Sequence, residues 1–594
     1  MKISFLQEDF FLSMRNHKPF HVCLSLQRVV LLVILLIGGT LLGQATVPTE
    51  ADRHGWPTLK SPKKVIVCTP GKTNAESMLL QSLSGLAAQA VNEDKFDEMV
   101  WVDTDGEDYK HVFEQSCLAL NIRFFQKLDV WTLLEYLTSK GIVKGYVTYH
   151  LNSEEKTYPI TDYSCNVATV YCSLLSGVLV DSSIERKVQA YGLHCLKDAR
   201  KESITECFRK NKKHLNNVSA LSVHPSVSNM RDFAIAHKLM LYADERELIE
   251  SVLKWVRPLS PILGWGCGDE FDATSVISEW GHYNTASDWC HNLPFLSAAA
   301  PYISLKKAKS VSLNEIDFTD STYVHSFVMS DGDNMQWTIG GITSDTKYMG
   351  HQDAGDLHVN WTLCPINLSV ISPATWNRMV TIQHKNNSII EYGAGYQYPD
   401  LFGVKRENRK ELLRLFAERV NKQLKKLDVK IFGALFQDLH SKSAQEALQI
   451  YVEEMEDITG IIAIQYHPYE LGKQVLWFKN KKGISVPVIT ADYALWDAVD
   501  INRPHCGTPE YIASLINRET LDGASSNEYS WTIVHAWSDF QKSSAITEVP
   551  SVGVNPIKAT ESHLLNSVRV VSLEELLWRV RMKYHPEQVK SLMK

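Results

Sequence analysis

The chain has 594 residues, of which 44% are hydrophobic and 22% are charged. This composition is typical of a globular protein with more than one domain, and it excludes a mainly disordered or collagen-like chain. The formal net charge of −7 at pH 7 offers no basic excess to a phosphate backbone, so we expect no nucleic-acid partner.

Residues 1–45 have the pattern of a targeting segment. An uncharged apolar run at 29–42 follows several basic residues, and the small residues that signal peptidase reads come directly after it, in Gly43-Gln44-Ala45. The run is shorter than the roughly 20 residues that cross a bilayer and close to the roughly 7–15 of a signal-peptide core. We therefore expect either a cleaved signal peptide or an uncleaved anchor that holds the chain in a membrane through residues 29–42. Because the basic residues precede the run, both interpretations predict a secreted or single-pass membrane protein with a lumenal or extracellular carboxyl-terminal domain.

The cysteines and glycosylation sequons agree with that compartment. Ten of the 11 cysteines follow the apolar run and could form up to five disulfides, for example Cys195 with Cys207 or Cys267 with Cys290, although sequence does not fix the pairing. Their spacing does not match a structural zinc site. Sequons for N-glycosylation occur at Asn217, Asn360, Asn367 and Asn386.

The next two segments are expected to be a linker and an α/β region. Residues 46–62 are polar, rich in proline and without periodicity, which predicts a linker. From 63 to 250, β-rich apolar runs alternate with helical patterns, which predicts a parallel sheet covered by helices, in one unit or in two subdomains. The expected strands are 65–69, 99–102, 143–150 and 166–171, and the expected helices include 75–91 (with Asn74 as its N-cap), 130–140 and 187–218.

Residues 251–594 have a more regular rhythm that predicts a (β/α)8-like barrel. Several of the expected strands are separated by good helices, at 406–427, 442–458 and 509–517. The fold class is therefore α/β, an amino-terminal parallel-sheet region followed by this barrel. The eight expected strands are 262–265, 324–329, 358–363, 388–392, 430–436, 460–466, 486–490 and 532–536.

Polar and aromatic clusters follow these strands, and in a barrel the carboxyl ends of the strands share one face. Residues 330–334 read SDGDN, and their carboxylates admit three interpretations: an acid/base or acid/nucleophile pair, a cation site, or a plain Asx turn. A calcium-binding EF-hand loop would also need a Glu at a fixed later position, and the sequence has none there, so this type of cation site is excluded. Glu270, which ends an earlier strand beside two glycines, is the best partner for Asp331, and the competing carboxylates are Asp269, Asp438 and Asp492.

The most specific pattern is G-A-G-Y-Q-Y-P at residues 393–399. Its glycines allow a tight turn or a close approach of the backbone, and its two tyrosines would point the same way in an extended loop. This segment resembles the motif that names the GxGYxYP family of glycoside hydrolase-like proteins. The resemblance extends over roughly 60–585, and the segments GWGCGDE, SDGDN and VHAWS also look like blocks of that family. It implies α/β amino-terminal segments and a barrel-like carboxyl-terminal domain.

We therefore expect a glycoside hydrolase that acts on an extracytoplasmic carbohydrate, with Glu270 and Asp331 as the catalytic pair. Two alternatives remain open: a non-catalytic carbohydrate-binding protein on the same scaffold, and a metal-assisted hydrolase with Asp331 and Asp333 as ligands. No nucleotide-binding glycine turn, nucleophile elbow or H-E-x-x-H motif is present, so no cofactor is expected. The expected substrate-binding residues are Asp333, Asn334, Tyr396, Tyr398, Asp492, His535 and Trp537.

Overall fold

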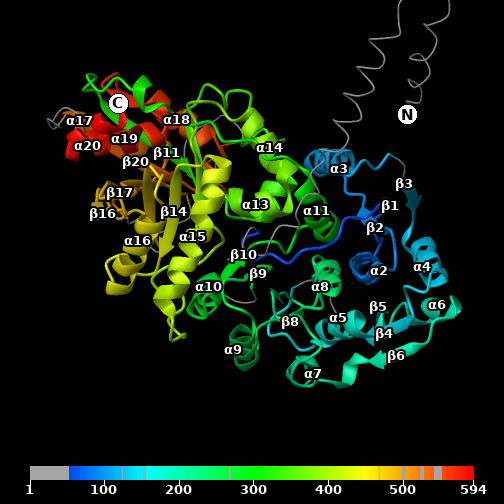
Figure 1. Ribbon diagram of the computed structural model, residues 1–594. Coiled ribbons are helices and arrows are strands. Elements are labelled where there is room, and N and C mark those ends of the chain that lie inside the picture. The colour runs from blue at the N-terminus through cyan, green and yellow to red at the C-terminus, as the bar shows by residue number, and fades with distance from the viewer. Residues whose placement is uncertain are drawn as a thin grey trace, which may run out of the picture. The chain divides into compact units, whose positions relative to one another are not determined.

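The computed structural model describes residues 53–594 except 124, 151–155, 267–268, 467, 498–502, 522–527 and 541–550 (Figure 1). The predicted targeting segment, including the apolar run at 29–42, lies outside the described residues. Across the residues that are described, no helix is both long and apolar enough to cross a bilayer.

The first half of the described chain forms three small sheets in which every strand pairing is parallel. Residues 63–250 were predicted to form one α/β unit or two subdomains, whereas the structure divides this half among three sheets. The sheets, in spatial order, are β2 (Glu98–Val102), β1 (Lys64–Cys68), β3 (Phe125–Leu128); β5 (Gly177–Asp181), β4 (Gly145–Tyr149), β6 (Cys195–Asp198); and β10 (Tyr283–Thr285), β9 (Pro261–Leu263), β7 (Ala220–Ser222), β8 (Met240–Tyr242).

Helices connect and cover these strands. Helix α2 is buried on nearly every side because it packs against α8 as well as against β2 and β5. Its N-cap is Thr73, whose hydroxyl accepts a hydrogen bond from Glu76 N, and not the predicted Asn74, which is the first helical residue. The helices of this half are α2 (Asn74–Asn92), α3 (Glu107–Ala119), α4 (Val130–Ser139), α5 (Ser164–Leu175), α6 (Glu185–Ala190), α7 (Ile204–Asn211), α8 (Arg231–His237), α9 (Arg246–Trp255), α10 (Glu270–Glu279) and α11 (Leu293–Ala299).

Two predicted elements of this half are wrong. The expected strand at 166–171 lies inside α5, and the expected helix at 187–218 is interrupted by β6. Tertiary contacts override the β-branched composition of α5, because its residues Asn166 and Thr169 share one helix face. Both accept hydrogen bonds from the buried Arg231 guanidinium, at 3.0 and 2.7 Å.

The expected boundary at 250/251 cuts through the third sheet. Strands β7 and β8 lie before it and β9 and β10 lie after it, yet all four are paired side by side. The strand predicted at 262–265 as the first of the barrel is therefore β9 of this small sheet.

The second half of the described chain builds one large sheet, in which only β16 runs antiparallel to its neighbour. The spatial order is β16, β17, β15, β14, β13, β12, β11, β20, β18, β19, and β21 also pairs with β11. The bounds are β11 (Tyr323–Met329), β12 (Val359–Leu363), β13 (Ile389–Tyr392), β14 (Ile431–Phe436), β15 (Gly460–Gln465), β16 (Val475–Lys479), β17 (Ser485–Thr490), β18 (Tyr493–Leu495), β19 (Cys506–Gly507), β20 (Tyr529–Val534) and β21 (Val568–Val570).

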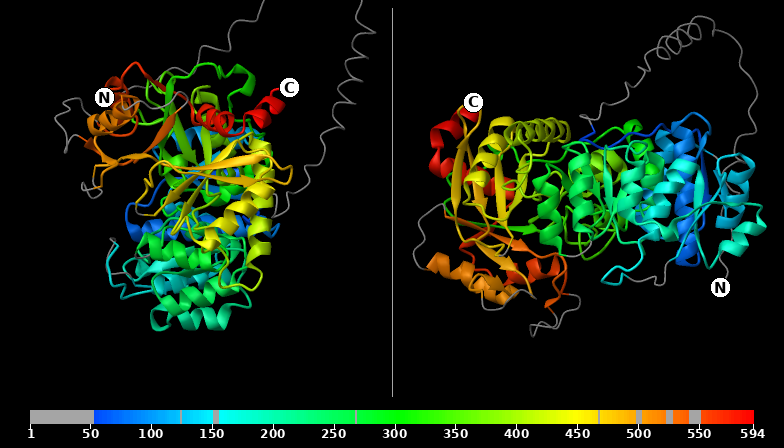
Figure 2. Two further views of the ribbon diagram at one scale, coloured as in Figure 1. Left: turned by 90° about the vertical axis from the view of Figure 1, so that its left-hand side faces the viewer. Right: turned by 90° about the horizontal axis from the view of Figure 1, so that it is seen from below.

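This sheet is a curled half-barrel, and the predicted (β/α)8 barrel is not confirmed (Figure 2). Seven of the eight predicted strands belong to it, and the eighth is β9. The chain passes from β17 to β18 through only Ala491 and Asp492, with no helix between them. Strand β17 pairs with β15 while β18 pairs with β20, so this one segment lies along two different strands instead of supplying two complete barrel strands.

Helices also pack on the large sheet, and α15 packs against α16 alongside β14 (Figure 1). Their apolar faces are buried and their charged faces are exposed, as their sequence periodicity requires. The helices of this half are α12 (Met335–Gly340), α13 (Pro365–Ile371), α14 (Pro373–Ile382), α15 (Arg409–Leu427), α16 (Lys442–Glu454), α17 (Pro509–Leu521), α18 (Asn555–Ser562), α19 (Leu573–Tyr584) and α20 (Pro586–Leu592).

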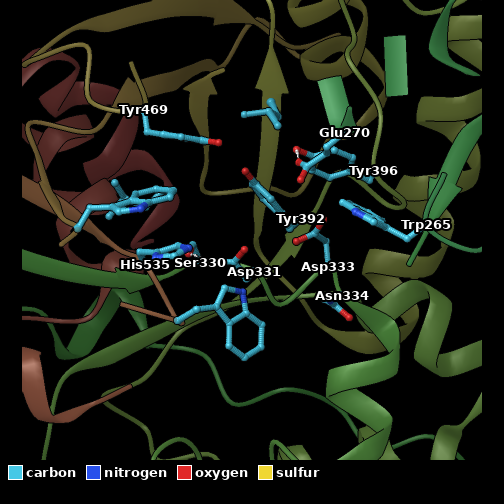
Figure 3. A pocket seen from close by; sticks show the side chains of 14 residues that line it. Trp265, Glu270, Ser330, Asp331, Asp333, Asn334, Tyr392, Tyr396, Tyr469 and His535 are labelled. Atoms are coloured by element: carbon cyan, nitrogen blue, oxygen red, sulfur yellow. Dashed lines mark hydrogen bonds between the residues drawn. The ribbon is translucent and has the colours of Figure 1, made fainter. Parts of the chain in front are cut away.

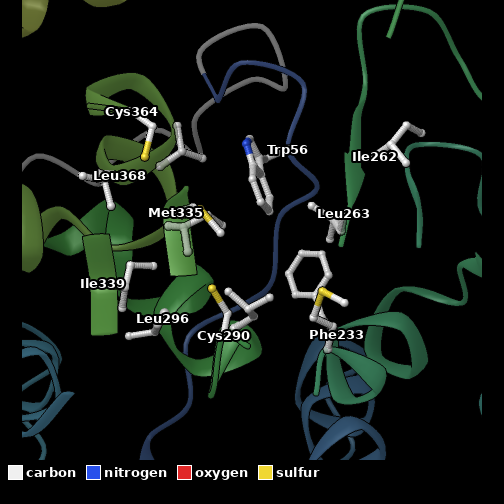
Figure 4. Packing of buried hydrophobic residues seen from close by; sticks show 14 of the residues in the cluster. Trp56, Phe233, Ile262, Leu263, Cys290, Leu296, Met335, Ile339, Cys364 and Leu368 are labelled. Atoms are coloured by element: carbon white, nitrogen blue, oxygen red, sulfur yellow. The ribbon is translucent and has the colours of Figure 1, made fainter. Parts of the chain in front are cut away.

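Part of the predicted linker is core. Trp56 is fully buried, and its indole N–H donates to Asn367 Oδ1 at 3.0 Å. Figure 4 shows this ring among buried residues of both halves, with Phe233 on one side and Met335 on the other. The linker prediction for 46–62 is therefore wrong from residue 53 onward, where a patternless sequence nonetheless packs into the interior.

Two of the four sequons are also incompatible with the fold. Asn360 and Asn367 are at most 1% exposed, and their side chains take part in internal hydrogen bonds, so neither can carry a glycan in the folded protein. Asn217 is exposed and Asn386 is partly exposed, which leaves these two as candidate acceptors.

The predicted disulfide between Cys195 and Cys207 is not formed. Both thiols are free: Cys207 lies on the buried face of α7, whereas Cys195 is exposed at the start of β6. The other described cysteines are free as well, and Cys267, the suggested partner of Cys290, lies outside the described residues.

Candidate active site

A cavity of about 310 Å³ lies at the carboxyl ends of β11, β13 and β20, beside the first turn of α10 (Figure 3). It contains most of the residues that the sequence predicted for a site. Those that line it are Glu270, Asp331, Asp333, Asn334, Tyr396, His535 and Trp537.

Glu270 is placed by the start of α10. The preceding Asp269 caps this helix by accepting hydrogen bonds from two backbone N–H groups, so Glu270 occupies the first turn. The hydroxyl of Tyr396 donates to Glu270 Oε1 at 2.5 Å. Burial raises the pKa of Glu270, this hydrogen bond opposes the shift, and the nearby charge of Asp331 adds to it.

Asp331 and Asp333 are placed by the tight turn that follows β11. A Cβ on the intervening Gly332 would lie 1.5 Å from the carbonyl oxygen of Thr362, so only glycine allows this close approach. The hydroxyl of Ser330 donates to Asp331 Oδ2. Burial, followed by the charges of Asp331 and Glu270, raises the pKa of Asp333 well above its usual value.

Asn334 has the role that the Asx-turn interpretation gave to this segment. Its side chain caps α12 by accepting a hydrogen bond from Trp337 N, at 3.3 Å. The two aspartates do not share that role, so the SDGDN segment combines one structural amide with two carboxyl groups that line the cavity.

The GxGYxYP loop joins the third sheet to the large sheet. Gly395 has φ +108°, and a Cβ there would lie 2.1 Å from the ring of Tyr283. The next residue, Tyr396, exchanges two backbone hydrogen bonds of 2.8 Å with Asn284 of β10. The buried His54 supports the same loop through a 2.7 Å hydrogen bond between its Nε2 and the carbonyl oxygen of Ala394. The loop can therefore carry the Tyr396 hydroxyl across to Glu270 on α10.

Aromatic rings form the walls of the cavity. Tyr469, Trp496 and His535 stack in a row, with ring centroids 4.6 and 3.9 Å apart. Trp265 and Tyr396 lie at 5.4 Å from one another on another side. Such flat, partly polar surfaces suit the faces of sugar rings.

Two predicted site residues do not line the cavity. Tyr398 is fully buried with its ring against Phe271 and Tyr466, so it packs behind the site. Asp492 lies between β17 and β18, where its Oδ2 accepts a hydrogen bond from Trp531 N at 3.0 Å, and burial raises its pKa to about 7. Its role in the described structure is to connect strands.

Sequence reasoning missed five polar or aromatic lining residues, as well as the apolar Leu435 and Ile533. Four of them lie in strand-end segments that the sequence had already marked as polar and aromatic, but their individual roles needed the three-dimensional arrangement. The fifth follows β18, a strand that was not predicted. These residues are Trp265, Ser330, Tyr392, Tyr469 and Trp496.

The metal-assisted alternative called for Asp331, Asp333 and a histidine without an opposing carboxylate. The described structure places Glu270 in the same cavity as these aspartates and His535. Among the residues described, no three His, Cys, Asp or Glu side chains are grouped so that they could hold a metal ion. The cavity is arranged as carboxyl groups facing one another and not as a ligand set.

Comparison with protein families gives three matches along the chain. They are "GxGYxYP_N second domain" at 143–215, "GxGYxYP third domain" at 217–298 and "GxGYxYP putative glycoside hydrolase C-terminal domain" at 320–577. Glu270 falls within the third-domain match and Asp331 within the carboxyl-terminal one, so the cavity is built from two matched domains.

A solved structure has a similar fold. It is described as "Crystal structure of a putative hydrolase from Bacteroides thetaiotaomicron VPI-5482 at 1.25 A resolution". The similarity has a TM-score of 0.74 and covers 91% of this chain and 99% of that chain, with 22% sequence identity. A search of curated proteins finds no match.

Proposed function

This chain belongs to the GxGYxYP family, and we propose that it is a glycoside hydrolase whose reaction takes place in the cavity between α10 and the end of β11. The observation that carries this proposal is the placement of Glu270 and Asp331 in one aromatic-walled cavity, where burial, with a smaller effect from the charge of Asp331, raises the pKa of Glu270. Glycoside hydrolysis needs this asymmetry, because one carboxyl group must be protonated while the other is ionised.

We assign the general-acid role to Glu270. Its raised pKa favours the protonated form that can donate to a glycosidic oxygen, and the Tyr396 hydroxyl fixes the orientation of its carboxyl group. Asp331 is the ionised partner, which attacks the anomeric carbon or activates a water molecule. The hydrogen bond from the Ser330 hydroxyl stabilises its negative charge.

The remaining lining residues position the sugar. Asp333 and Asn334 offer hydrogen-bonding groups, His535 and Trp537 provide ring surfaces, and Tyr396 contributes both. Tyr398 supports the Tyr396 ring from behind, with centroids 6.1 Å apart.

We also propose that the protein acts outside the cytoplasm on an extracytoplasmic carbohydrate. The apolar run at 29–42 and the accessible sequon asparagines Asn217 and Asn386 support this location. Expression in a secretory host should then give a protein whose mass falls on treatment with an N-glycan-removing enzyme. Substitution of both Asn217 and Asn386 by Gln should remove that change in mass, and a purely cytoplasmic, unglycosylated product would contradict the proposed location.

The hydrolase proposal is tested by measuring released sugar. Wild-type protein is incubated with a panel of aryl glycosides and natural oligosaccharides, and turnover is then compared with that of Glu270→Gln and Asp331→Asn. Each substitution should lower turnover by at least about a hundredfold, the scale of a lost general acid or base. Matched controls are Glu135→Gln on α4 and Asp105→Asn before α3, both exposed and away from the cavity. Wild-type turnover in both site variants on a verified substrate would contradict the assignment.

A further inference from the structure

The cavity has an unbalanced set of charges. Its lining has three carboxyl groups, those of Glu270, Asp331 and Asp333, and includes neither Lys nor Arg. Its one basic side chain is His535, and burial lowers the pKa of that imidazole, which favours the neutral form. The cavity therefore concentrates carboxyl groups in a partly desolvated space, with no cationic side chain among its lining residues.

Asp333 stands out within this set. The residue is only 9% exposed, and its carboxyl group interacts with its own backbone N–H, while no other residue of the described structure donates a hydrogen bond to it. Figure 3 shows its carboxyl group facing the cavity close to Tyr392. Burying a carboxyl group that has so few donors is costly, and such a group gains most from a ligand that supplies a positive charge or a donor.

The walls favour the same kind of ligand. Rings from Trp265 and Tyr396 lie on one side and the Tyr469–Trp496 stack lies on another, so aromatic faces surround the carboxyl groups. The faces of Trp and Tyr rings are electron-rich and attract cations, and the attraction grows as water is removed. Carboxylates enclosed by aromatic rings are the chemistry that recognises an ammonium group.

We propose that the sugar bound in this cavity carries a protonated amino group, which Asp333 and the aromatic walls hold. The inference rests on the proposed function, since it names the substrate class of the same site. A cavity of about 310 Å³ is near the lower limit for small-molecule sites, which suits a single sugar ring. Uronic acids and sulfated sugars are disfavoured, because their negative charge would lie near Asp331 in a cavity whose lining has neither Lys nor Arg.

Binding of such a sugar should release a proton. Burial and its acidic neighbours raise the pKa of Asp333 and so favour its neutral form when no cation lies beside it. An ammonium group beside it lowers its pKa, so the proton passes to the buffer and a carboxylate–ammonium pair remains. This linkage can be measured without any catalytic turnover.

The test is calorimetric titration of the wild-type protein with free monosaccharides. Glucosamine and galactosamine are compared with glucose, galactose, N-acetylglucosamine and glucuronate, in two pH 7 buffers of different ionisation enthalpy. One of the amino sugars should bind at least about tenfold more tightly than its parent hexose, with proton release that depends on the buffer. Glucuronate should bind most weakly. Equal affinity for amino and parent sugars, or tighter binding of glucuronate, would overturn the proposal.

Two variants complete the test. Asp333→Asn should lose the preference for the amino sugar together with the proton release, while Asp105→Asn, outside the cavity, should retain both. If Asp333→Asn keeps both the preference for the amino sugar and the proton release, Asp333 is not the group that holds the amine. Failure of this inference and failure of the hydrolase proposal are distinguishable. Hydrolysis without amine preference contradicts only the substrate class, and amine binding without any hydrolysis contradicts only the catalytic function.

Discussion

At the amino end of the large sheet, Glu575 accepts hydrogen bonds from Arg569 and Arg579 at 2.8 and 2.9 Å, whereas at the carboxyl end Glu270 faces Asp331 in a cavity without Lys or Arg. The amino end also has a cavity, of about 280 Å³, but acidic and basic side chains share its lining. Hydrogen bonds from Thr322, with a smaller effect from Arg569, lower the pKa of Asp320 there. The same residue types thus experience opposite electrostatic environments at the two ends of one sheet.

This difference separates stabilising charges from functional ones. A carboxylate that is paired and hydrogen-bonded strengthens the fold, and its pKa falls. A carboxyl group that is buried near others of its kind weakens the fold, and its pKa rises, so its presence points to a chemical role. The electrostatic difference between the two ends therefore supports the proposed site at the carboxyl end independently of the GxGYxYP motif.

The largest effect is expected from substituting the matched glutamates at the two ends. Glu270→Gln should lower turnover by about a hundredfold or more and leave the thermal unfolding midpoint unchanged or raised, because Gln keeps an oxygen that can accept from Tyr396 and removes a buried carboxyl group near the charge of Asp331. Glu575→Gln should keep turnover within about twofold and lower the free energy of unfolding by about 1–2 kcal/mol, between the values for exposed and buried ion pairs. Sugar-release assays and urea unfolding of the same preparations give both readouts. A Glu575→Gln protein that is inactive but as stable as wild type would contradict the assignment of stability to the amino end and of function to the carboxyl end.

A smaller effect is expected in the pH dependence of stability at the carboxyl end. Because the folded-state pKa of Asp333 is raised, the folded protein binds this proton more tightly, and stability falls as the pH rises from about 4 toward that raised pKa. Asp333→Asn removes this contribution. The variant should match wild type near pH 4 and become progressively more stable than wild type at higher pH, as measured by thermal unfolding between pH 4.5 and 8.5. In the variant, the fall of stability with rising pH should be smaller than in wild type but still present, since Glu391, whose pKa burial raises to about 8, still contributes.

Local patterns predicted much of the fold, and tertiary pairing accounts for the errors. Strands β11 to β15 and helices α15 and α16 followed from apolar periodicity and helical spacing. The prediction of an eight-stranded barrel was not confirmed, because apolar periodicity indicates that a strand exists but not which strand it pairs with. Strand β9 joins β7 and β10, and the segment from β17 to β18 lies along two different strands. The core residue Trp56 lies in a segment without any periodic signal, so only its packing identifies it as core.

The candidate site was predicted best where one residue type is obligatory. The GxGYxYP loop and the SDGDN turn each contain a glycine that the structure requires, at Gly395 and Gly332, and the residues beside those glycines line the cavity. Asp492 was misassigned because a polar residue after a strand can serve strand pairing as well as a ligand. The stacking of Trp496 on His535 joins segments that follow two different strands, a relation that the sequence of either segment does not contain.

The smallest effect is expected from Asp320 at the amino end, and it should have the opposite pH dependence to that of Asp333. The folded-state pKa of Asp320 is lowered, so its stabilising contribution is present above the unfolded-state value and is lost as the pH falls through the folded-state value. Asp320→Asn retains an oxygen that can accept from Thr322 N but loses the ion pair with Arg569, at 3.1 Å. Because both partners are partly exposed, the variant should be less stable than wild type at pH 7 by no more than about 1 kcal/mol. The difference should shrink as the pH falls below about 4, and it should also shrink in 0.5 M salt, where a Debye length of about 4 Å weakens the pair. Thermal unfolding under these conditions measures the difference. If Asp320→Asn became more stable than wild type as the pH rises, as Asp333→Asn should, the two ends of the sheet would not differ as their charges indicate.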